Sequence, residues 1–547
     1  MSDDPAQLLR LVTEMAALIE KDDDPDPQLY ALFFQNPEWS LQLITLIDSL
    51  DEAHIYEDPP IYSACIFALD ICVAQLHAAA TDGNNKVSAK NLLLLMNQLA
   101  ELINSNKHSL SFWLPILNSF YEVHVELAPA LKDAYFELAS NEDDSLDEDN
   151  ELSHLDSIRD LIHELSDLSI FDIAEHFFAQ SYAMPTEFFA DLIVDLYSID
   201  EGQDIAILIL LHPKAEVRAI AVATLDQMMD AVTLTSVSLS RLETIKQWYA
   251  ETYHGFFNKW IRTQRKKGVV FESEPAVVNL SIKATEVDGT GSQGLFIHVR
   301  KNRKNRLCGL LLKYRLGIKD AWLTPCIAAT EVKEYYQQAF AESVTLREVD
   351  LSYLQMMVAH FLAIMIEQGT IPHLHFLEIQ ELIGVRLRPK KLDIEALFEQ
   401  LSMQITPFTQ EVIEASLQRS KSWLKNKQFT ESWYLENPSV DKIVNHNSSF
   451  VNGVKICRLD AAMAAVFAEE MELNREQWQF HFLWIALWFK AKEKKNEKVW
   501  RDSFLIAHTI QQGHPLKDIP VMREICHQTV INSVETMQER RTHLSRE

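Results

Sequence analysis

The clearest pattern of apolar positions along the chain lies between His212 and Met229. Apolar residues recur there at spacings of three and four, at Val217, Ile220, Ala221, Leu225, Met228 and Met229. This spacing places them on one side of a helix and predicts one buried face. Pro213 suits the first turn of that helix, where a missing N–H group has no consequence. The apolar run Ile205–Leu211 predicts the end of a preceding helix.

Helical periodicity extends over most of the chain that precedes residue 268. It predicts helices at Ala6–Ile19, Trp39–Leu50, Ile61–Ala79, Ser88–Ile103, Leu110–Leu138, Ile158–Ile170, Asp172–Ala179, Glu187–Tyr197 and Leu239–Gln264. The run Asn141–Asn150 holds six acidic residues in ten and interrupts this pattern. Such a run repels itself, so it predicts a solvated linker.

Between residues 268 and 328 the pattern changes from the period of a helix to that of a strand. Segments rich in β-forming residues are Val277–Val287, Leu295–Val299 and Arg306–Tyr314. The turn-like segments Asp288–Gly294 and Asn302–Asn305 separate them. We expect a small antiparallel meander here, with a further strand at Ala321–Pro325.

Helical patterning returns in the C-terminal part of the chain. The predicted helices are Ala329–Ser343, Leu351–Gln368, Ile394–Leu401, Gln410–Lys425, Ala461–Glu472, Arg475–Glu493 and Val499–Met537, the last broken near Gly513. Gln477–Phe489 carries apolar side chains nearly all round, which is typical of a central, buried helix.

One segment carries a family resemblance. A proline start, a Val-Arg pair, a small residue three positions later and a leucine four beyond resemble a HEAT repeat over residues 205–230. The matching positions are Pro213, Glu216, Val217, Arg218, Ala221 and Leu225. The resemblance implies an α-solenoid of stacked helix pairs that binds other macromolecules. It also implies a structural role for these repeat positions, with Arg218 bracing neighbouring turns.

The expected fold is therefore mainly α, a helical-repeat solenoid with a small antiparallel β-meander and a C-terminal helical bundle. The expected parts are an N-terminal helical domain (1–139), an acidic linker (140–156), HEAT-like repeats (157–267), the β-meander with a basic hairpin (268–328), a helical region (329–430) and the C-terminal bundle (431–547).

Composition narrows the classes of protein that fit. The 547 residues are 47% hydrophobic, with a net charge of -29, which suits a folded, multi-module chain. The six cysteines form no CxxC pair, so neither a disulfide framework nor a zinc ribbon is indicated. Apolar windows such as Ile205–Leu211 and Phe480–Phe489 are shorter than a bilayer span. We expect a cytoplasmic protein without a membrane segment.

The sequence carries no catalytic signature. The loop Gly289–Gly294 spells GxGxxG, but a strand follows it instead of the helix that a dinucleotide site needs. We therefore expect a hairpin loop and no cofactor. Nucleophile motifs and phosphate-binding loops are also missing. His360, His373, His375 and Glu378 are residue types that bind zinc or iron, yet without a supporting motif no metal site is assigned.

One region of this acidic chain is strongly basic. Residues 260–319 contain thirteen lysines and arginines against four acidic residues. The candidates for an anion or partner contact at the hairpin tip are Arg300, Lys301, Arg303, Lys304 and Arg306. The alternative for these residues is a solubilising turn that binds nothing. The first interpretation is a protein-binding scaffold. The alternative is a nucleic-acid-associated factor that uses the 260–319 region, and a metal-dependent enzyme around His360, His373, His375 and Glu378 is the third. The oligomeric state stays open.

Overall fold

A computed structural model gives the fold of the chain. It describes residues 5–20, 31–33, 35–54, 60–81, 85–123, 125–143, 150–179, 181, 184, 186–272, 279–301, 304–339, 345–425, 433–451, 454–492 and 499–544. The chain forms two compact units, Met1–Val232 and Thr233–Glu547, called here the first and second units. Their boundary falls inside the segment 157–267 that the sequence assigned to helical repeats.

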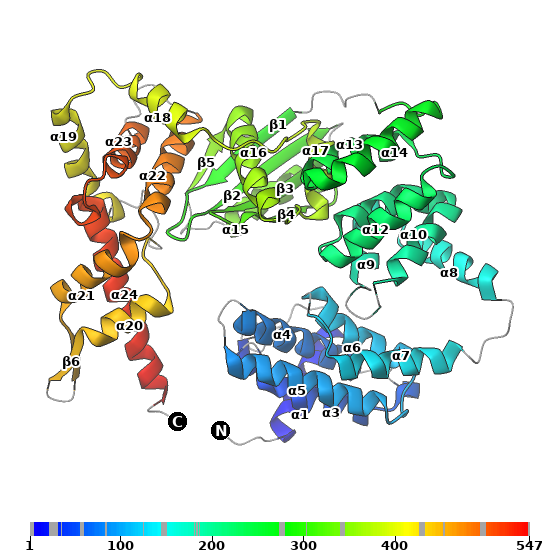
Figure 1. Cartoon of the computed structure of the whole chain (residues 1–547). Helices are drawn as coiled ribbons and strands as arrows, with labels where there is room; N and C mark the ends of the chain where they lie inside the picture. Colours follow the sequence, from blue (N-terminus) through cyan, green and yellow to red (C-terminus); the bar gives the residue numbers. More distant parts are fainter. Residues whose placement is uncertain are drawn as a thin grey trace. The chain divides into compact units, whose positions relative to one another are not determined.

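The first half of the first unit is a group of helices around one apolar core. They are α1 (Pro5–Ile19), α3 (Ser40–Ser49), α4 (Ile61–Thr81), α5 (Lys86–Ile103), α6 (Leu110–Glu122) and α7 (Pro129–Asp143) (Figure 1). Side chains from all six helices join a single buried cluster, in which Val12, Leu69, Leu99, Trp113 and Leu131 are fully buried. The amphipathic patterns of α1 and α5 are typical of such packing.

Helix α4 is apolar on nearly all sides. It is long and apolar enough to pass as a membrane span by length and composition, which the inspection of apolar windows in the sequence had missed. In the structure it packs against α1, α3, α5 and α6, and nine of its side chains are buried. A central position in the core explains its composition, because such a helix has apolar neighbours on several sides.

Two expectations for the region around residue 140 need correction. The single helix predicted over Leu110–Leu138 is two helices, and Pro129 occupies the first position of the second, where proline is favoured. The acidic linker is shorter than the expected range 140–156, because helices extend into both of its ends. Helix α7 continues to Asp143 and α8 (Asn150–Glu164) starts at Asn150, while residues 144–149 lie outside the described residues.

The HEAT-like segment ends the first unit. It follows α9 (Ile170–Ala179) and α10 (Phe188–Ser198). It begins within α11 (Gln203–Ala206) and continues through a buried 3₁₀ turn, Ile207–Leu211. In α12 (Ala215–Met228) the side chains of Val217, Ala221 and Leu225 are fully buried, as their spacing predicted. Pro213 lies two residues before the helix, so its placement in the first turn was wrong. Arg218 Nη1 donates to the carbonyls of His212 (2.8 Å) and Pro213 (2.7 Å).

The second unit begins with helices and a five-stranded antiparallel sheet. The helices are α13 (Ser236–Ile245) and α14 (His254–Lys266), and the strands are β1 (Asn279–Thr285), β2 (Ser292–Lys301), β3 (Lys304–Lys313), β4 (Gly317–Leu323) and β5 (Leu346–Val349). One helix was predicted over Leu239–Gln264. It is broken because Tyr249 and Ala250 adopt extended backbone angles.

The sheet has the order β4-β3-β2-β1-β5, so the predicted meander of four strands is confirmed. The sequence missed β5, which follows α15 (Ala329–Ala339) and pairs with the far edge of β1. One face of the sheet is apolar and packs on α16 (Leu351–Glu367) and α17 (Leu374–Ile383). Helix α15 covers part of the other face (Figure 1).

A buried group of polar side chains joins the sheet to two helices. Tyr353 of α16 donates its hydroxyl to Gln293 Oε1 of β2 over 2.7 Å. Trp484 Nε1 donates to the same oxygen over 3.1 Å, and Gln293 Nε2 donates to the carbonyl of Thr285 over 2.7 Å. Because unpaired buried polar groups are destabilising, these bonds fix the register of the helices on the sheet.

The C-terminal part of the second unit is mainly helical. It contains α18 (Ile394–Ser402), α19 (Gln410–Ser420), α20 (Pro438–His446), α21 (Leu459–Val466), α22 (Arg475–Lys490), α23 (Val499–Gln511) and α24 (Pro520–Leu544). A short hairpin, β6 (Ser448–Val451) and β7 (Val454–Cys457), was not predicted. Helix α22 buries every residue from Phe480 to Phe489, which confirms its predicted central position. The chain is thus mainly helical with a small antiparallel sheet.

Candidate functional site

The basic hairpin predicted from the sequence is the connection between β2 and β3. Arg300, Lys301 and Lys304 are exposed at its tip, and Lys301 is paired with Lys304 across the two strands. Consecutive residues of a strand point to opposite faces of the sheet. Arg300 therefore lies on the face that α15 covers, and Lys301 on the face of α16 and α17. Arg303 lies outside the described residues.

Arg306 does not project with the tip, contrary to the sequence-based expectation. Its Nε donates to the carbonyl of Thr324 over 2.8 Å, and its Nη2 contacts Glu378 Oε1 over 3.2 Å. The carboxylate of Glu378 is almost fully buried. The guanidinium thus fastens β3 to β4 and α17, and its role is structural.

Lys301 lines a cavity of about 910 Å³ within the second unit, which we call the basic groove. Its walls come from α13, the start of α16, the end of α17 and the segment that follows α17. The lining residues are Val237, Ser240, Arg241, Thr244, Glu272, Lys301, Gln355, Leu377, Gln380, Glu381, Gly384, Val385, Arg386 and Arg388. Four basic and two acidic side chains therefore meet in one cavity.

The segment after α17 is shaped to present its arginines. Gly384 ends the helix in the left-handed conformation, with φ of 67°, which glycine adopts without strain. Leu387 then points into the core, while Arg386 and Arg388 on either side of it are exposed. The sequence analysis overlooked this signal, a run from residue 386 to 391 with four basic residues and no acidic residue.

Two buried polar side chains form the base of the groove. Arg241 is held by Glu381 through two hydrogen bonds, from Nε over 2.8 Å and from Nη2 over 2.9 Å. Gln380 accepts the backbone N–H of Leu387 over 2.7 Å. Its Nε2 is buried at the edge of the groove without a hydrogen-bond acceptor among the described residues. This amide is therefore a donor that a bound molecule can use.

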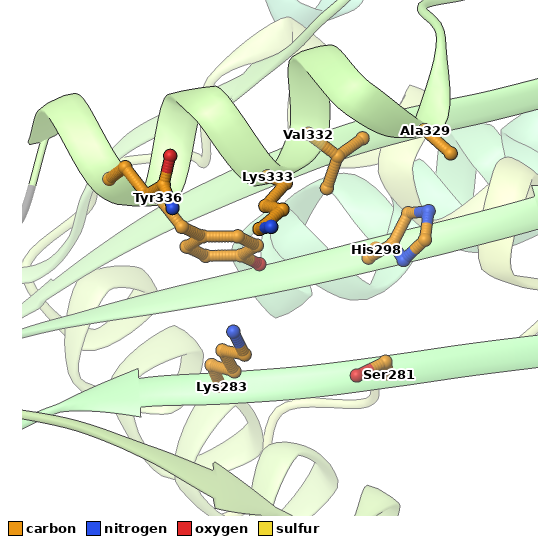
Figure 2. Close-up of a pocket in the computed structure, with 8 residues that line it drawn as sticks. Ser281, Lys283, His298, Ala329, Val332, Lys333 and Tyr336 are labelled. Carbon is orange, nitrogen blue, oxygen red and sulfur yellow. The ribbon is translucent and has the colours of Figure 1, made fainter.

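A second, smaller cavity of about 310 Å³ lies on the opposite face of the sheet, and we call it the sheet pocket. Its lining residues come from β1, β2 and α15, and they are Ser281, Lys283, His298, Ala329, Val332, Lys333, Tyr336 and Gln337. Figure 2 shows the side chains of Lys283 and Ser281 on β1 and of His298 on β2, below Lys333 and Tyr336 of α15.

The histidines considered as metal ligands do not all lie together. His373 precedes α17 as its N-cap, and His375 lies inside that helix. The centroids of these two rings are 5.3 Å apart. His375 Nδ1 is 3.0 Å from Glu378 Oε2. Nδ1 of His360 instead accepts the N–H of Leu392 over 3.2 Å, and burial lowers the pKa of His360 to about 4.

These four side chains do not form one group of ligand atoms in the described part of the chain. A Glu378 that already contacts Arg306 and His375 is also a poor candidate for a metal ligand. Ligand atoms of His373 and His375 do lie within 4.8 Å of one another. The metal-dependent enzyme stays an untested prediction.

The GxGxxG segment lies in a hairpin, as the sequence analysis expected. Gly289–Gly291 belong to the turn between β1 and β2, and Ser292–Gly294 are the first residues of β2. Asp288 Oδ1 accepts the backbone N–H groups of Thr290 and Ser292 over 2.9 and 2.8 Å. Gly291 has φ of 77°, and a side chain there would meet the ring of His481. The glycine therefore serves a tight turn against α22.

Comparisons with known proteins cover parts of the chain. A family model described as the Y4lR second domain matches residues 185–268, and another described as the Y4lR C-terminal helical domain matches residues 395–534. "Uncharacterized protein y4lR" of Sinorhizobium fredii is 26% identical over 266 residues, which is 47% of this chain and 47% of that protein. The matched segment thus spans about half the length of that relative. No solved structure matches the chain.

The descriptions of these families and of this relative name no ligand and no activity. The HEAT-like segment 205–230 lies inside the match to the second domain, and the helical-repeat interpretation stays a prediction. Most of the residues that line the basic groove, and all of those that line the sheet pocket, lie between the two matched ranges. The proposals below therefore rest on the geometry of these cavities.

Proposed function

We propose that this chain is a cytoplasmic protein-binding scaffold whose second unit captures an acidic segment of a partner protein in the basic groove. The observation that carries the proposal is the meeting of Arg241, Lys301, Arg386 and Arg388, from three separate segments, on one large cavity. A helical-repeat architecture of the first unit belongs to the same proposal. The buried face of α12 and the contacts of Arg218 support it.

The charge of the groove favours an anionic ligand. Glu381 is engaged with Arg241, so the charges that face a ligand are those of Lys301, Arg386 and Arg388 against Glu272. The second unit as a whole has 41 basic and 36 acidic residues, whereas the first has 9 and 43. The groove therefore lies in the unit with the less negative charge balance, which repels anions less than the first unit does.

The mixture of polar groups favours a polypeptide over nucleic acid. The carboxylate of Glu272 can accept hydrogen bonds from the backbone N–H groups of a peptide, and a phosphate backbone offers no such donors. The unpaired amide of Gln380 can donate to a peptide carbonyl. A volume of about 910 Å³ falls within the range of ligand cavities in proteins, which are usually some 300–1,000 Å³.

Nucleic acid is the second candidate, because α14 exposes a separate basic surface. Arg262, Arg265, Lys266 and Lys267 are all exposed at and just beyond its C-terminal end. Lysine and arginine side chains bind phosphates through charge neutralisation, and such binding weakens steeply as salt rises. The two candidates therefore use different residues of the second unit.

The test measures binding of two labelled probes to the full chain by fluorescence anisotropy. One probe is a peptide of eight glutamates, and the other is a single-stranded oligothymidylate. The groove variant carries Lys301→Ser, Arg386→Ser and Arg388→Ser. A matched control variant loses three exposed charges elsewhere on the second unit, through Lys319→Ser, Lys421→Ser and Lys517→Ser.

We expect the peptide to bind the intact chain and the control variant, and to bind the groove variant at least tenfold more weakly. Equal losses of peptide affinity in both variants would show a general effect of charge and refute the groove as the binding site. If the oligonucleotide binds more tightly than the peptide, and serines at the four α14 positions abolish this binding, the nucleic-acid function replaces our proposal. A pull-down with and without nuclease then identifies the natural partner.

A further inference from the structure

A different site, on the other face of the sheet, fits a small molecule. We propose that the sheet pocket binds a phosphate monoester, whose dianionic head is held by Lys283, His298 and Lys333. The inference is independent of the basic groove, because the two cavities share no lining residue.

The lining of the sheet pocket is basic without opposing acid. Two lysines and a histidine converge from β1, β2 and α15, and no carboxylate occurs among the described residues that line the cavity. Glu348 of β5 lies directly opposite Lys283 in the sheet register. Its carboxylate is paired with Lys492. The ammonium group of Lys283 lies on the side of the pocket, over the ring of Tyr336.

The position of Lys283 is fixed by an aromatic ring. Its Nζ lies 3.9 Å from the centroid of Tyr336, over the face of the ring. A cation in this position is attracted by the electrons of the ring and loses little further freedom when an anion binds. Figure 2 shows the ammonium group of Lys283 directed toward α15, which also carries Lys333.

The histidine is oriented by a hydrogen bond behind the pocket. His298 Nε2 lies 3.0 Å from Asn305 Oδ1, and Asn305 Nδ2 donates to the carbonyl of Ile327 over 3.4 Å. The amide thus presents its oxygen to the ring, so Nε2 carries a proton. In the imidazolium form of His298, Nδ1 carries the second proton and can donate it to a phosphate oxygen. Ser281 is the neighbour of His298 in the register of β1 and β2, and its hydroxyl adds a further donor.

The remaining walls suit the organic part of an ester. Val332 is buried beside Ala329, and the ring of Tyr336 is half-buried. Burial raises the pKa of Tyr336, so its hydroxyl keeps its proton and can donate to an oxygen of the ligand. A cavity of about 310 Å³ admits a compact ester and is too small for a polymer.

The test is a titration of the full chain with phenyl phosphate and with inorganic phosphate, followed by ³¹P NMR line broadening at low ionic strength. Because the groove is also basic, all proteins carry Lys301→Ser, Arg386→Ser and Arg388→Ser. Lys283→Gln and Lys333→Gln are compared with Lys319→Gln. Lys319 is an exposed lysine of the same sheet outside both cavities.

We expect phenyl phosphate to bind at least threefold more tightly than inorganic phosphate, and each pocket variant to weaken its binding at least tenfold. The control variant should bind like its parent. Lys333 is exposed on a helix, so Lys333→Gln still measures the contribution of the pocket to binding if Lys283→Gln disturbs the sheet. Four results would each overturn the assignment. Phenyl phosphate does not bind, the control variant weakens its binding equally, Lys333→Gln leaves its binding unchanged, or both probes bind with equal affinity. Because the groove is already disabled, these results do not depend on the proposed peptide binding.

Discussion

Replacing Glu381 by glutamine should weaken the fold and strengthen the binding of an acidic peptide. Glu381 accepts two hydrogen bonds from Arg241, whose side chain is 5% exposed, whereas Glu381 itself is 37% exposed. Glutamine has the same shape but keeps only one oxygen and no charge. The variant therefore removes one charged acceptor from a buried guanidinium and a negative charge from the groove.

The two effects can be sized separately. A hydrogen bond to a charged group contributes about 1.5–3 kcal/mol. Because solvent reaches Glu381, we expect a loss of about 1–2 kcal/mol in the free energy of unfolding. For the ligand, one unit charge at about 8 Å and an effective dielectric constant of about 20 gives roughly 2 kcal/mol. Screening at physiological salt reduces this value, so the peptide should bind about three- to tenfold more tightly.

The assay combines urea unfolding, followed by tryptophan fluorescence, with the anisotropy titration of the glutamate peptide. Nine of the eleven tryptophans belong to the second unit, so the fluorescence reports mainly on that unit. The matched control is Glu367→Gln, which breaks the exposed pair of Glu367 and Lys391 outside the groove. It should change stability by less than about 0.5 kcal/mol and leave peptide affinity nearly unchanged. The reasoning fails if Glu381→Gln binds the peptide no more tightly than the intact chain, or if the control shows the same gain.

Two further predictions concern the stability of the fold. Gly291→Ala should destabilise the chain by about 2 kcal/mol more than Gly369→Ala, in urea unfolding. Both glycines have positive φ, but the added carbon would lie 2.3 Å from His481 Nε2 at the first and meets nothing at the second; equal losses would contradict the contact. Acid should also destabilise the chain, because burial lowers the pKa values of His212 and His360 from 6.5 to about 3 and 4. The unfolded chain binds more protons below pH 6.5, so this stability is complete above pH 6.5 and is lost as the pH falls toward 4. A thermal midpoint that is the same at pH 7.5 and pH 5 would rule this out.

The sequence by itself determined the local elements and their buried faces. The spacing of Val217, Ala221 and Leu225 was enough to place them in a core, because helical period and apolar burial are properties of a short segment. The same holds for the four-strand meander and for the aromatic helix Arg475–Lys490. The errors fall where a helix continues or stops for reasons outside the pattern, as at Tyr249.

Only the tertiary structure decided which charged side chains act together. The sequence placed Lys301 and Arg306 in one basic cluster, yet the fold directs Lys301 into a groove and Arg306 onto Glu378. The groove also gathers Arg241 and Arg388, which lie far from the hairpin in sequence. Charge attraction depends on distance in space, and long-range packing sets that distance. No local pattern of residues encodes it, so the candidate sites became visible only in the fold.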